Sequence, residues 1–267
     1  LVETHIERHA KAWIATCIDS EFSTVLLDRS TLIARGDRKA VAVSTEGTSL
    51  DVVRSTIRGE SGDEFLYLLQ LANTQGSIVN SMLSTGTSRD QIALDLERSP
   101  LAVYHTSILL GNGGNLEIGI RVQDDRVPAV VNSLIAGSPA ETSRLSAAVV
   151  LGSPDGIPRL LGNAFGGFQE IVHLPTTSYT DAEEANRRLD SDPEGGSVQA
   201  NIEVVPRSVV YIDPDHVVRS AAGGPLVDAG VDLNLFGLRI TEDFDGDTRP
   251  SGGPERGYDI GADELTE

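Results

Sequence analysis

The residues of this chain that could do chemistry include three alternating aspartates near its C-terminal end. Asp243, Asp245 and Asp247 occupy every second position of the stretch DFDGDTRP. Carboxylates at this spacing suit a hard cation, so the stretch is a candidate Ca²⁺ site, with Asp259 and Asp263 as the nearest further carboxylates. The competing interpretation, which we favour, is that these side chains accept backbone N–H groups in tight turns.

A second candidate chemistry is polysaccharide cleavage. A lyase that acts on uronic acids needs a base, often Arg, Lys or His, and Arg54 and His105 are the best candidates. The competing interpretations, which we favour, are a solvated surface charge for Arg54 and a polar residue on an exposed sheet for His105. A glycosidase needs a pair of carboxyl groups flanking the scissile bond, and the acidic pairs of this chain fall in predicted loops without a partner motif. The sequence has no nucleophile elbow, phosphate loop or dinucleotide fingerprint.

A repeat defines the elements that must position these residues. The phrase VVRSTIRG (residues 52–59) returns in related forms, and its central polar residue recurs at intervals of 25, 26, 25, 27 and 30 residues. These central residues are Ser30, Ser55, Ser81, Thr106, Ser133 and Asn163. A second, aliphatic series precedes the first by 12 to 14 residues and consists of Val43, Leu68, Leu94, Ile120 and Val149. The repeat therefore predicts two strands per unit.

A period in the middle twenties fits two architectures. A leucine-rich repeat would show regular Leu spacing and a helix in most repeats, whereas this sequence has almost no helical stretch between its strands. We therefore predict an all-β fold, a right-handed parallel β-helix with at least six coils between residues 26 and 167. The aromatic content of 4% agrees, because short aliphatic side chains must then build the core.

The alternation of side chains along a strand assigns the faces of each coil. Around Ser55, we expect Val53 and Ile57 to share its inward face, and Arg54 and Thr56 to point outward. The inward polar residues would form a ladder of hydrogen bonds along the axis. The outward residues just before them would form a polar strip, with about 4.8 Å between coils, suited to an extended polymer. This strip consists of Arg29, Arg54, Asn80, His105 and Asn132, and ends at Gly162.

The regular repeat is lost after residue 167. We predict a single domain in which residues 1–212 form the coils, with an irregular insertion at about 168–197, and residues 213–267 form a turn-rich C-terminal cap. Thr180 and Glu183 have the spacing of a capping box, which predicts a short surface helix. Strands near 198–205 and 209–212 would complete one more coil. The cap would plug the last coil with Leu226, Val227, Leu233, Leu235, Phe236, Leu238 and Ile240.

Charge and composition exclude several classes of partner. The chain has 40 acidic and 21 basic residues, a net charge of −19, so nucleic acid is not an expected partner. No apolar run is long enough to span a membrane. Cys17 is the only cysteine, which rules out an intrachain disulfide, and its apolar neighbours predict a buried structural thiol.

Three motifs near the C-terminal end resemble a known family. GGPLVDAG (residues 223–230), DFDGDTRP (243–250) and YDIGADE (258–264) look like the C-terminal signature of bacterial choice-of-anchor Q domain proteins. The chain departs from that signature at residues 224–228, where the family more often has Ser-Pro-Ala-Ile-Asp. The resemblance implies a right-handed parallel β-helix body, export to the bacterial cell surface, and a variable anchor after the signature, which we expect to be absent or removed here. It implies no particular reaction.

These observations together predict an extracellular or cell-surface β-helix module. We expect it to be non-catalytic and to bind polysaccharide or a surface protein along the polar strip, with Ca²⁺ as the one candidate cofactor. The alternative is a polysaccharide lyase or glycoside hydrolase that acts along the outer face near Arg54 and His105. Fold class alone does not decide between the two.

Overall fold

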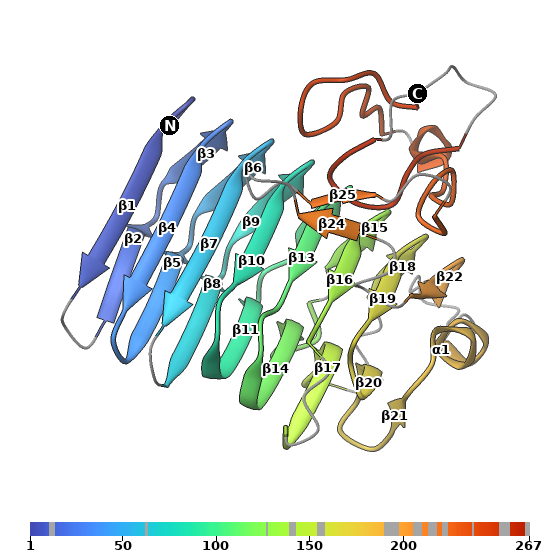
Figure 1. The fold of residues 1–267 in the computed structure, drawn as a ribbon, viewed down its shortest axis with the longest axis horizontal. Coiled ribbons are helices and arrows are strands. Elements are labelled where there is room, and N and C mark those ends of the chain that lie inside the picture. Colours follow the sequence, from blue (N-terminus) through green and yellow to red (C-terminus); the bar gives the residue numbers. More distant parts are fainter. Residues whose placement is uncertain are drawn as a thin grey trace.

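The computed structural model describes residues 1–10, 14–61, 64–126, 128–138, 143–153, 158–189, 198–204, 210–212, 218–220, 224–236, 238–250 and 257–264. The described chain winds into a solenoid with three parallel sheets along its axis (Figure 1). The prediction of an all-β parallel β-helix is therefore confirmed.

Each coil contributes one strand to each sheet, in the order B, C, A. Sheet A contains β3 (Thr24–Asp28), β6 (Ser49–Val53), β9 (Gln75–Val79), β12 (Leu101–Tyr104), β15 (Ala129–Val131), β18 (Arg159–Leu161) and β22 (Val198–Gln199). Sheet B contains β1 (His5–Ala10), β4 (Thr31–Gly36), β7 (Thr56–Ser61), β10 (Met82–Thr85), β13 (Ser107–Leu109), β16 (Leu134–Ala136), β19 (Ala164–Gly166) and β23 (Ile202–Glu203). Sheet C contains β2 (Ile14–Glu21), β5 (Lys39–Glu46), β8 (Phe65–Ala72), β11 (Ser88–Glu97), β14 (Gly113–Val122), β17 (Leu145–Leu151), β20 (Glu170–His173) and the antiparallel β21 (Ser178–Tyr179).

A separate hairpin and two short helices complete the described elements. β24 (Val210–Ile212) pairs antiparallel with β25 (Val218–Ser220), so this stretch does not form part of a further coil as predicted. The strands predicted near 198–205 do extend the solenoid, as β22 and β23. The helices are α1 (Ala182–Leu189) and the 3₁₀ helix η1 (Leu233–Phe236).

The prediction of two strands per coil is wrong, because the repeated phrase contains a turn. VVRSTIRG spans the end of β6 and the start of β7, with Arg54 and Ser55 between them. Arg54 has a φ of 45°, in the left-handed region, so side-chain alternation does not continue across it. As a result Val52 is buried and Val53 only half-buried, although Ile57 is buried as expected.

The aliphatic core lies between the three sheets. The second series of the repeat belongs to sheet C, where register aligns Val43, Leu69, Leu94, Ile120 and Val149. The predicted member Leu68 is therefore one residue from the aligned position. Both Leu68 and Leu69 are buried, and the ladder of paired residues skips Leu68 and its counterparts on the neighbouring strands.

The predicted inward ladder is present at the turns from sheet A to sheet B. The Ser30 N–H donates to Ser55 Oγ (3.0 Å), and the Ser55 N–H donates to Ser81 Oγ (3.2 Å). Each hydroxyl also donates to the carbonyl two residues earlier, as Ser55 does to Val53 (2.8 Å). The buried column contains Ser30, Ser55, Ser81, Thr106, Ser133, Asn163 and Asn201. These groups are costly to bury singly and satisfy one another along the axis.

A second ladder, which the sequence analysis missed, occupies the turns from sheet C to sheet A. The Thr74 N–H donates to Ser99 Oγ (2.9 Å), and Thr74 Oγ1 donates to the Ala72 carbonyl (3.1 Å). The preceding residues Asn73 and Arg98 both have a φ of 50°. A left-handed residue followed by Ser, Thr or Asn is thus the signature of the turn from sheet A to sheet B, and a left-handed residue followed by Ser or Thr marks the turn from sheet C to sheet A in the first four coils, as far as Ser99.

The predicted short surface helix is present as α1, whose exposed face carries Glu183, Arg187 and Arg188 and which covers the C-terminal end of the solenoid. It packs against β20, β21, β22 and β23. Its inward residues join the main core and are Ala182, Ala185 and Leu189. Asp181 is its N-cap, because Asp181 Oδ1 accepts the Glu184 N–H (2.6 Å). The predicted capping residue Thr180 lies one position too early.

Candidate functional site

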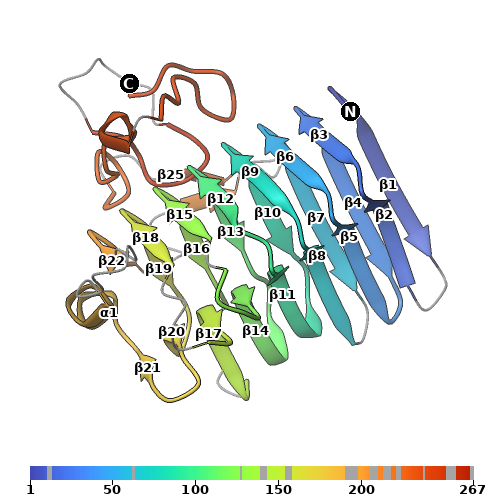
Figure 2. The same ribbon diagram turned by 180° about the vertical axis from the view of Figure 1, so that it is seen from behind.

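The C-terminal segment, residues 224–264, lies against the side of the solenoid. In both views it runs beside β15 and β18, along the A–B corner formed by the turns from sheet A to sheet B (Figures 1 and 2). Leu226 packs on the outer face of sheet B, in one cluster with Met82, Leu134, Ala136 and Ala164. Leu233 packs on the outer face of sheet A, in one cluster with Val131 and Leu161.

The prediction that this segment plugs the last coil is therefore wrong. Leu238 and Ile240 also pack on the sheet A side, while the side chains of Leu235 and Phe236 lie outside the described residues. The physical reason lies in sheet B, where one outward register row changes from Thr31 and Thr56 to apolar residues in later coils. Those apolar residues include Met82, Leu134 and Ala164. The end of the solenoid is already covered by α1, and the apolar side wall is what remains to be buried.

The predicted strip residues occupy the left-handed position of the A–B corner. Their φ angles lie between 44° and 50°, at Arg29, Arg54, Asn80, His105 and Asn132. The row exists, but the expectation that it is exposed is wrong for Asn80, His105 and Asn132. The C-terminal segment covers these three residues, whose exposed fractions are 3%, 0% and 0%.

The N-terminal members of the row remain closer to solvent. Arg54 forms ion pairs with Glu242 of the C-terminal segment (2.6 Å) and with Asp28 (3.4 Å). Asn80 Nδ2 donates to the backbone carbonyl of Glu242. Arg29 is half-exposed. The row therefore contributes mainly to holding the segment.

The side-chain amide of Asn132 pairs with the backbone of the C-terminal segment in the way that a neighbouring strand would. Its Nδ2 donates to the Val231 carbonyl (2.8 Å), and its Oδ1 accepts the Val231 N–H (2.7 Å). Its backbone carbonyl accepts the Gly261 N–H (2.9 Å). Gly261 has a φ of 115°, a conformation that favours glycine, so this contact depends on the glycine of the YDIGADE motif.

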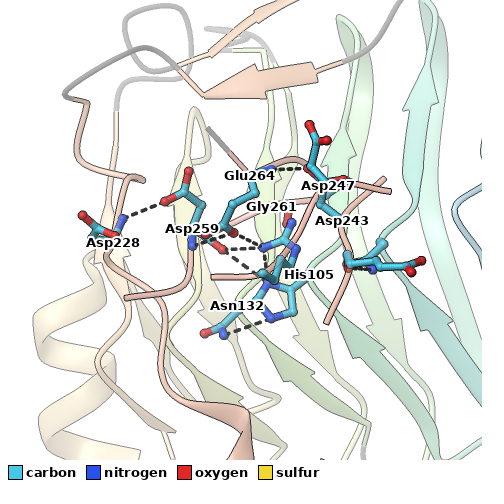
Figure 3. Close-up of polar contacts among 12 residues, drawn as sticks. His105, Asn132, Asp228, Asp243, Asp247, Asp259, Gly261 and Glu264 are labelled. Atoms are coloured by element: carbon cyan, nitrogen blue, oxygen red, sulfur yellow. Dashed lines mark hydrogen bonds and ion pairs between the residues drawn. The ribbon is translucent and has the colours of Figure 1, made fainter. Parts of the chain in front are cut away.

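His105 is the centre of a buried polar cluster at the A–B corner (Figure 3). This corner cluster consists of His105, Asn132, Arg249, Asp259 and Glu264. Arg249 Nη1 donates to His105 Nδ1 (2.8 Å) and to Glu264 Oε2 (2.8 Å), and Arg249 Nη2 donates to the Gly261 carbonyl (2.9 Å). Because Nδ1 accepts from a cation, the imidazole is neutral, and its Nε2 lies 3.4 Å from Asn132 Nδ2. Burial lowers the pKa of His105 well below its ordinary value, and the charge of Arg249 lowers it further.

Arg249 connects two of the sequence motifs. Its side chain is fully buried, and burial lowers its pKa, while the carboxylates of Glu264, Asp243, Asp259 and Asp263 oppose that shift. Glu264 is the direct partner and is 1% exposed. DFDGDTRP and YDIGADE thus form one unit around a buried ion pair, which the sequence analysis did not foresee.

At the candidate Ca²⁺ site, Asp243 makes the hydrogen bonds expected of an aspartate that caps a tight turn, which was the competing interpretation. Asp243 Oδ1 accepts the N–H groups of Gly246 (2.9 Å) and Asp247 (2.7 Å), and Asp243 Oδ2 accepts the Glu264 N–H (3.0 Å). Asp245 and Asp247 are exposed. The described residues contain no group of three or more His, Cys, Asp or Glu that could hold a metal ion. Asp243 acts as a turn cap.

At the A–B corner, both residues considered for lyase chemistry are already engaged within the fold. His105 does not reach solvent, and Arg54 is engaged by two carboxylates. The chemistry that this arrangement can perform is attachment of the C-terminal segment to the coils.

A second polar cluster lies on the outer face of sheet C, and the sequence analysis missed it. Arg121 donates from Nε and Nη2 to the two oxygens of Asp95, both at 2.8 Å, and Gln123 Nε2 also donates to Asp95 (2.8 Å). Lys39 Nζ lies 5.1 Å from the centroid of the Tyr67 ring. The sheet C cluster consists of Lys39, Tyr67, Gln70, Asp95, Arg121 and Gln123.

Register explains how this cluster forms. Gln70, Asp95 and Arg121 are direct neighbours on β8, β11 and β14. Their sequence spacing of 25 and 26 residues is the signal that could have found them. The hydrogen bonds to Asp95 raise the pKa of the Arg121 guanidinium, and burial raises the pKa of the Tyr67 phenol, so Arg121 is cationic and Tyr67 is neutral at neutral pH.

A buried acid faces the interior of the solenoid. Glu117 is fully buried, and its Oε1 accepts the Ser138 N–H (2.6 Å), while Oε2 has no hydrogen-bond partner. Burial raises its pKa from 4.5 to about 8, partly opposed by the N–H groups of Ser138 and Gly113. The carboxyl is therefore neutral over most of the physiological range.

Comparison with known proteins assigns the chain to no family. No protein-family model, curated protein or solved structure matches the chain. Within the described residues, no helix is long and apolar enough to cross a membrane.

Proposed function

We propose that this protein is a non-catalytic β-solenoid module that binds an extended polysaccharide through the outer face of sheet C. The observation that carries the proposal is the sheet C cluster. It presents planar polar groups and an aromatic ring in fixed positions on consecutive coils. Strands stack about 4.8 Å apart, so these side chains form a regular row along which an extended chain can lie.

The distribution of covered surface supports this choice of face. The hydrogen bonds and apolar contacts of the described C-terminal segment go to sheets A and B. Tyr67, Gln70 and Arg121 keep part of their surface exposed. A ligand can reach these side chains without displacing the segment.

The net charge narrows the class of ligand. A chain with a net charge of −19 repels a polyanion, which favours neutral glycans. The order of the C-terminal motifs, which resembles the choice-of-anchor Q signature, supports an extracellular or cell-surface location as part of the same proposal. The lyase alternative gains no support, since its candidate base His105 is buried.

A glycan array followed by titration calorimetry tests the proposal. We expect retention of an extended neutral glycan, at least a tenfold loss of affinity in Tyr67→Ala or Arg121→Ala, and no change in Arg29→Ala, which alters the A–B corner instead. Product analysis of the same mixtures should find no shortened or unsaturated oligosaccharides. Cleavage products would refute the non-catalytic assignment, and binding that only Arg29→Ala weakens would refute the sheet C face.

A further inference from the structure

The two ends of the solenoid differ in how they are covered. The C-terminal end is closed by α1, whereas no described residue covers the first coil. The large hydrophobic residues that are exposed in the described chain all belong to residues 1–26. They are Leu1, Val2, Ile14, Phe22 and Leu26, with exposed fractions from 45% to 79%. Ile14 and Leu26 lie in the outward rows of Lys39 and Asp51, whereas the inward residues of the first coil, which include Ile6, Ile18 and Val25, are only partly buried. An apolar coil end with unpaired strand edges is a surface that pairs with another β-structure.

The polar ladder of the A–B corner has an unused acceptor at this end, to which a further coil could donate. Thr4 has the same position as Ser30 and Ser55: its N–H donates to Ser30 Oγ (3.3 Å), and its hydroxyl donates to the carbonyl two residues earlier, at Val2 (3.1 Å). The preceding residue, Glu3, has a φ of 50°. In later coils the oxygens of Ser30, Ser55, Ser81 and Ser133 also accept an N–H from the coil before them, and no amide of the described chain donates to Thr4.

Sheet A shows the direction from which a further coil would arrive. Val2 forms a parallel bridge with Asp28, and the Leu1 nitrogen donates to the Leu26 carbonyl (2.7 Å). Leu1 and Val2 thus occupy the last two positions of a sheet A strand whose earlier positions would pair with Thr24, Val25 and Leu26. On that side of β3, no described strand pairs with Thr24 and Val25.

Arg8 indicates that a polypeptide covering this end should carry a negative charge opposite it. It pairs in register with Ala34, which is buried and inward-facing, so Arg8 stands at an inward position of the first coil. Its side chain is exposed and forms no ion pair with any described residue. Its neighbour Cys17 is half-buried, less than the sequence predicted, because nothing described covers this end.

We propose that this end is the interface for one further coil of the same solenoid, supplied by polypeptide that leads into Leu1 along sheet A and places a carboxylate opposite Arg8. The parallel register and the unused Thr4 acceptor favour this occupant over a second copy of the chain. A head-to-tail copy would meet α1, and a head-to-head copy related by a twofold axis would present antiparallel strands.

The chain itself supplies the probe. A copy of residues 27–51 placed directly before Leu1 continues the register, because Leu1 is then equivalent to Leu27 and Val52. In the copy, the residue facing Arg8 is the counterpart of Ala34, so Ala34→Glu in the copy supplies the carboxylate, and Ala34→Lys in the copy is the matched control. A third variant combines the Glu copy with Thr4→Val, which removes the ladder acceptor.

We expect the Glu copy to raise the unfolding midpoint by about 5 °C and to slow amide exchange in β1, β2 and β3. The Lys copy should give less than half of that rise, and Thr4→Val should reduce it. Equal midpoints for the Glu and Lys copies, or an extension without exchange protection, would overturn the proposal. So would sedimentation of the unextended chain as a dimer that Phe22→Asp dissociates, since a second copy would then occupy this end.

Discussion

Replacing Glu117 by Gln isolates the contribution of one buried acid to the pH dependence of stability. Glutamine keeps the shape of the side chain and can still accept the Ser138 N–H through its oxygen. It cannot ionise, so the difference between the two proteins reports the titration of Glu117 alone.

The sign follows from the direction of the pKa shift. Burial raises the pKa of Glu117 from 4.5 to about 8, so the folded protein holds a proton that the unfolded chain releases between these values. The contribution of the neutral acid is fully present below pH 4.5 and is lost as the pH rises towards 8. At about 1.4 kcal/mol per pKa unit the upper bound is about 5 kcal/mol. Because local relaxation screens a forming charge, we expect roughly half of that.

Urea unfolding at pH 5, 7 and 9 measures the effect. Wild type and Glu117→Gln should have similar free energies of unfolding at pH 5, and the variant should be more stable by about 2 to 3 kcal/mol at pH 9. Glu97→Gln, which alters a more exposed carboxylate of sheet C, is the matched control and should show no such trend. A difference between wild type and Glu117→Gln that stays constant from pH 5 to pH 9 would refute the reasoning.

Three further predictions concern the corner cluster and the ladder. Arg249→Ala leaves the Glu264 carboxylate buried without its partner and should cost about 3 to 5 kcal/mol in urea unfolding; a loss below about 1 kcal/mol would mean that the pair is not buried. His105, whose pKa is lowered in the fold, should take up a proton on unfolding as the pH falls below 6.5. Wild type should therefore lose stability in acid faster than His105→Gln, and parallel pH profiles would contradict this. Ser55→Ala removes the acceptor for the Ser30 N–H and should cost about 1 to 3 kcal/mol, against little change for the exposed Ser23→Ala.

Much of the coil could be predicted from the sequence because every coil repeats the same environment. Ser30, Ser55 and Ser81 recur because each occupies the same turn and satisfies the coil beside it. The same logic would have revealed the second ladder at Thr74 and Ser99, had the preceding left-handed residues been recognised as turns. The prediction of two strands per coil was wrong because hydrophobic periodicity does not reveal a left-handed residue such as Arg54, which separates two strands.

What the sequence by itself determined is the winding: the period, the inward ladder and the aliphatic core are local properties that each coil repeats. Only the tertiary structure decided where the C-terminal segment lies and which groups it buries. Arg249 meets His105 across 144 residues of chain, and no local pattern encodes that distance. The segment packs on the A–B corner because the outer faces of sheets A and B become apolar there, and burying that surface is favourable. The polar row that was predicted to bind a ligand therefore binds the C-terminal segment instead.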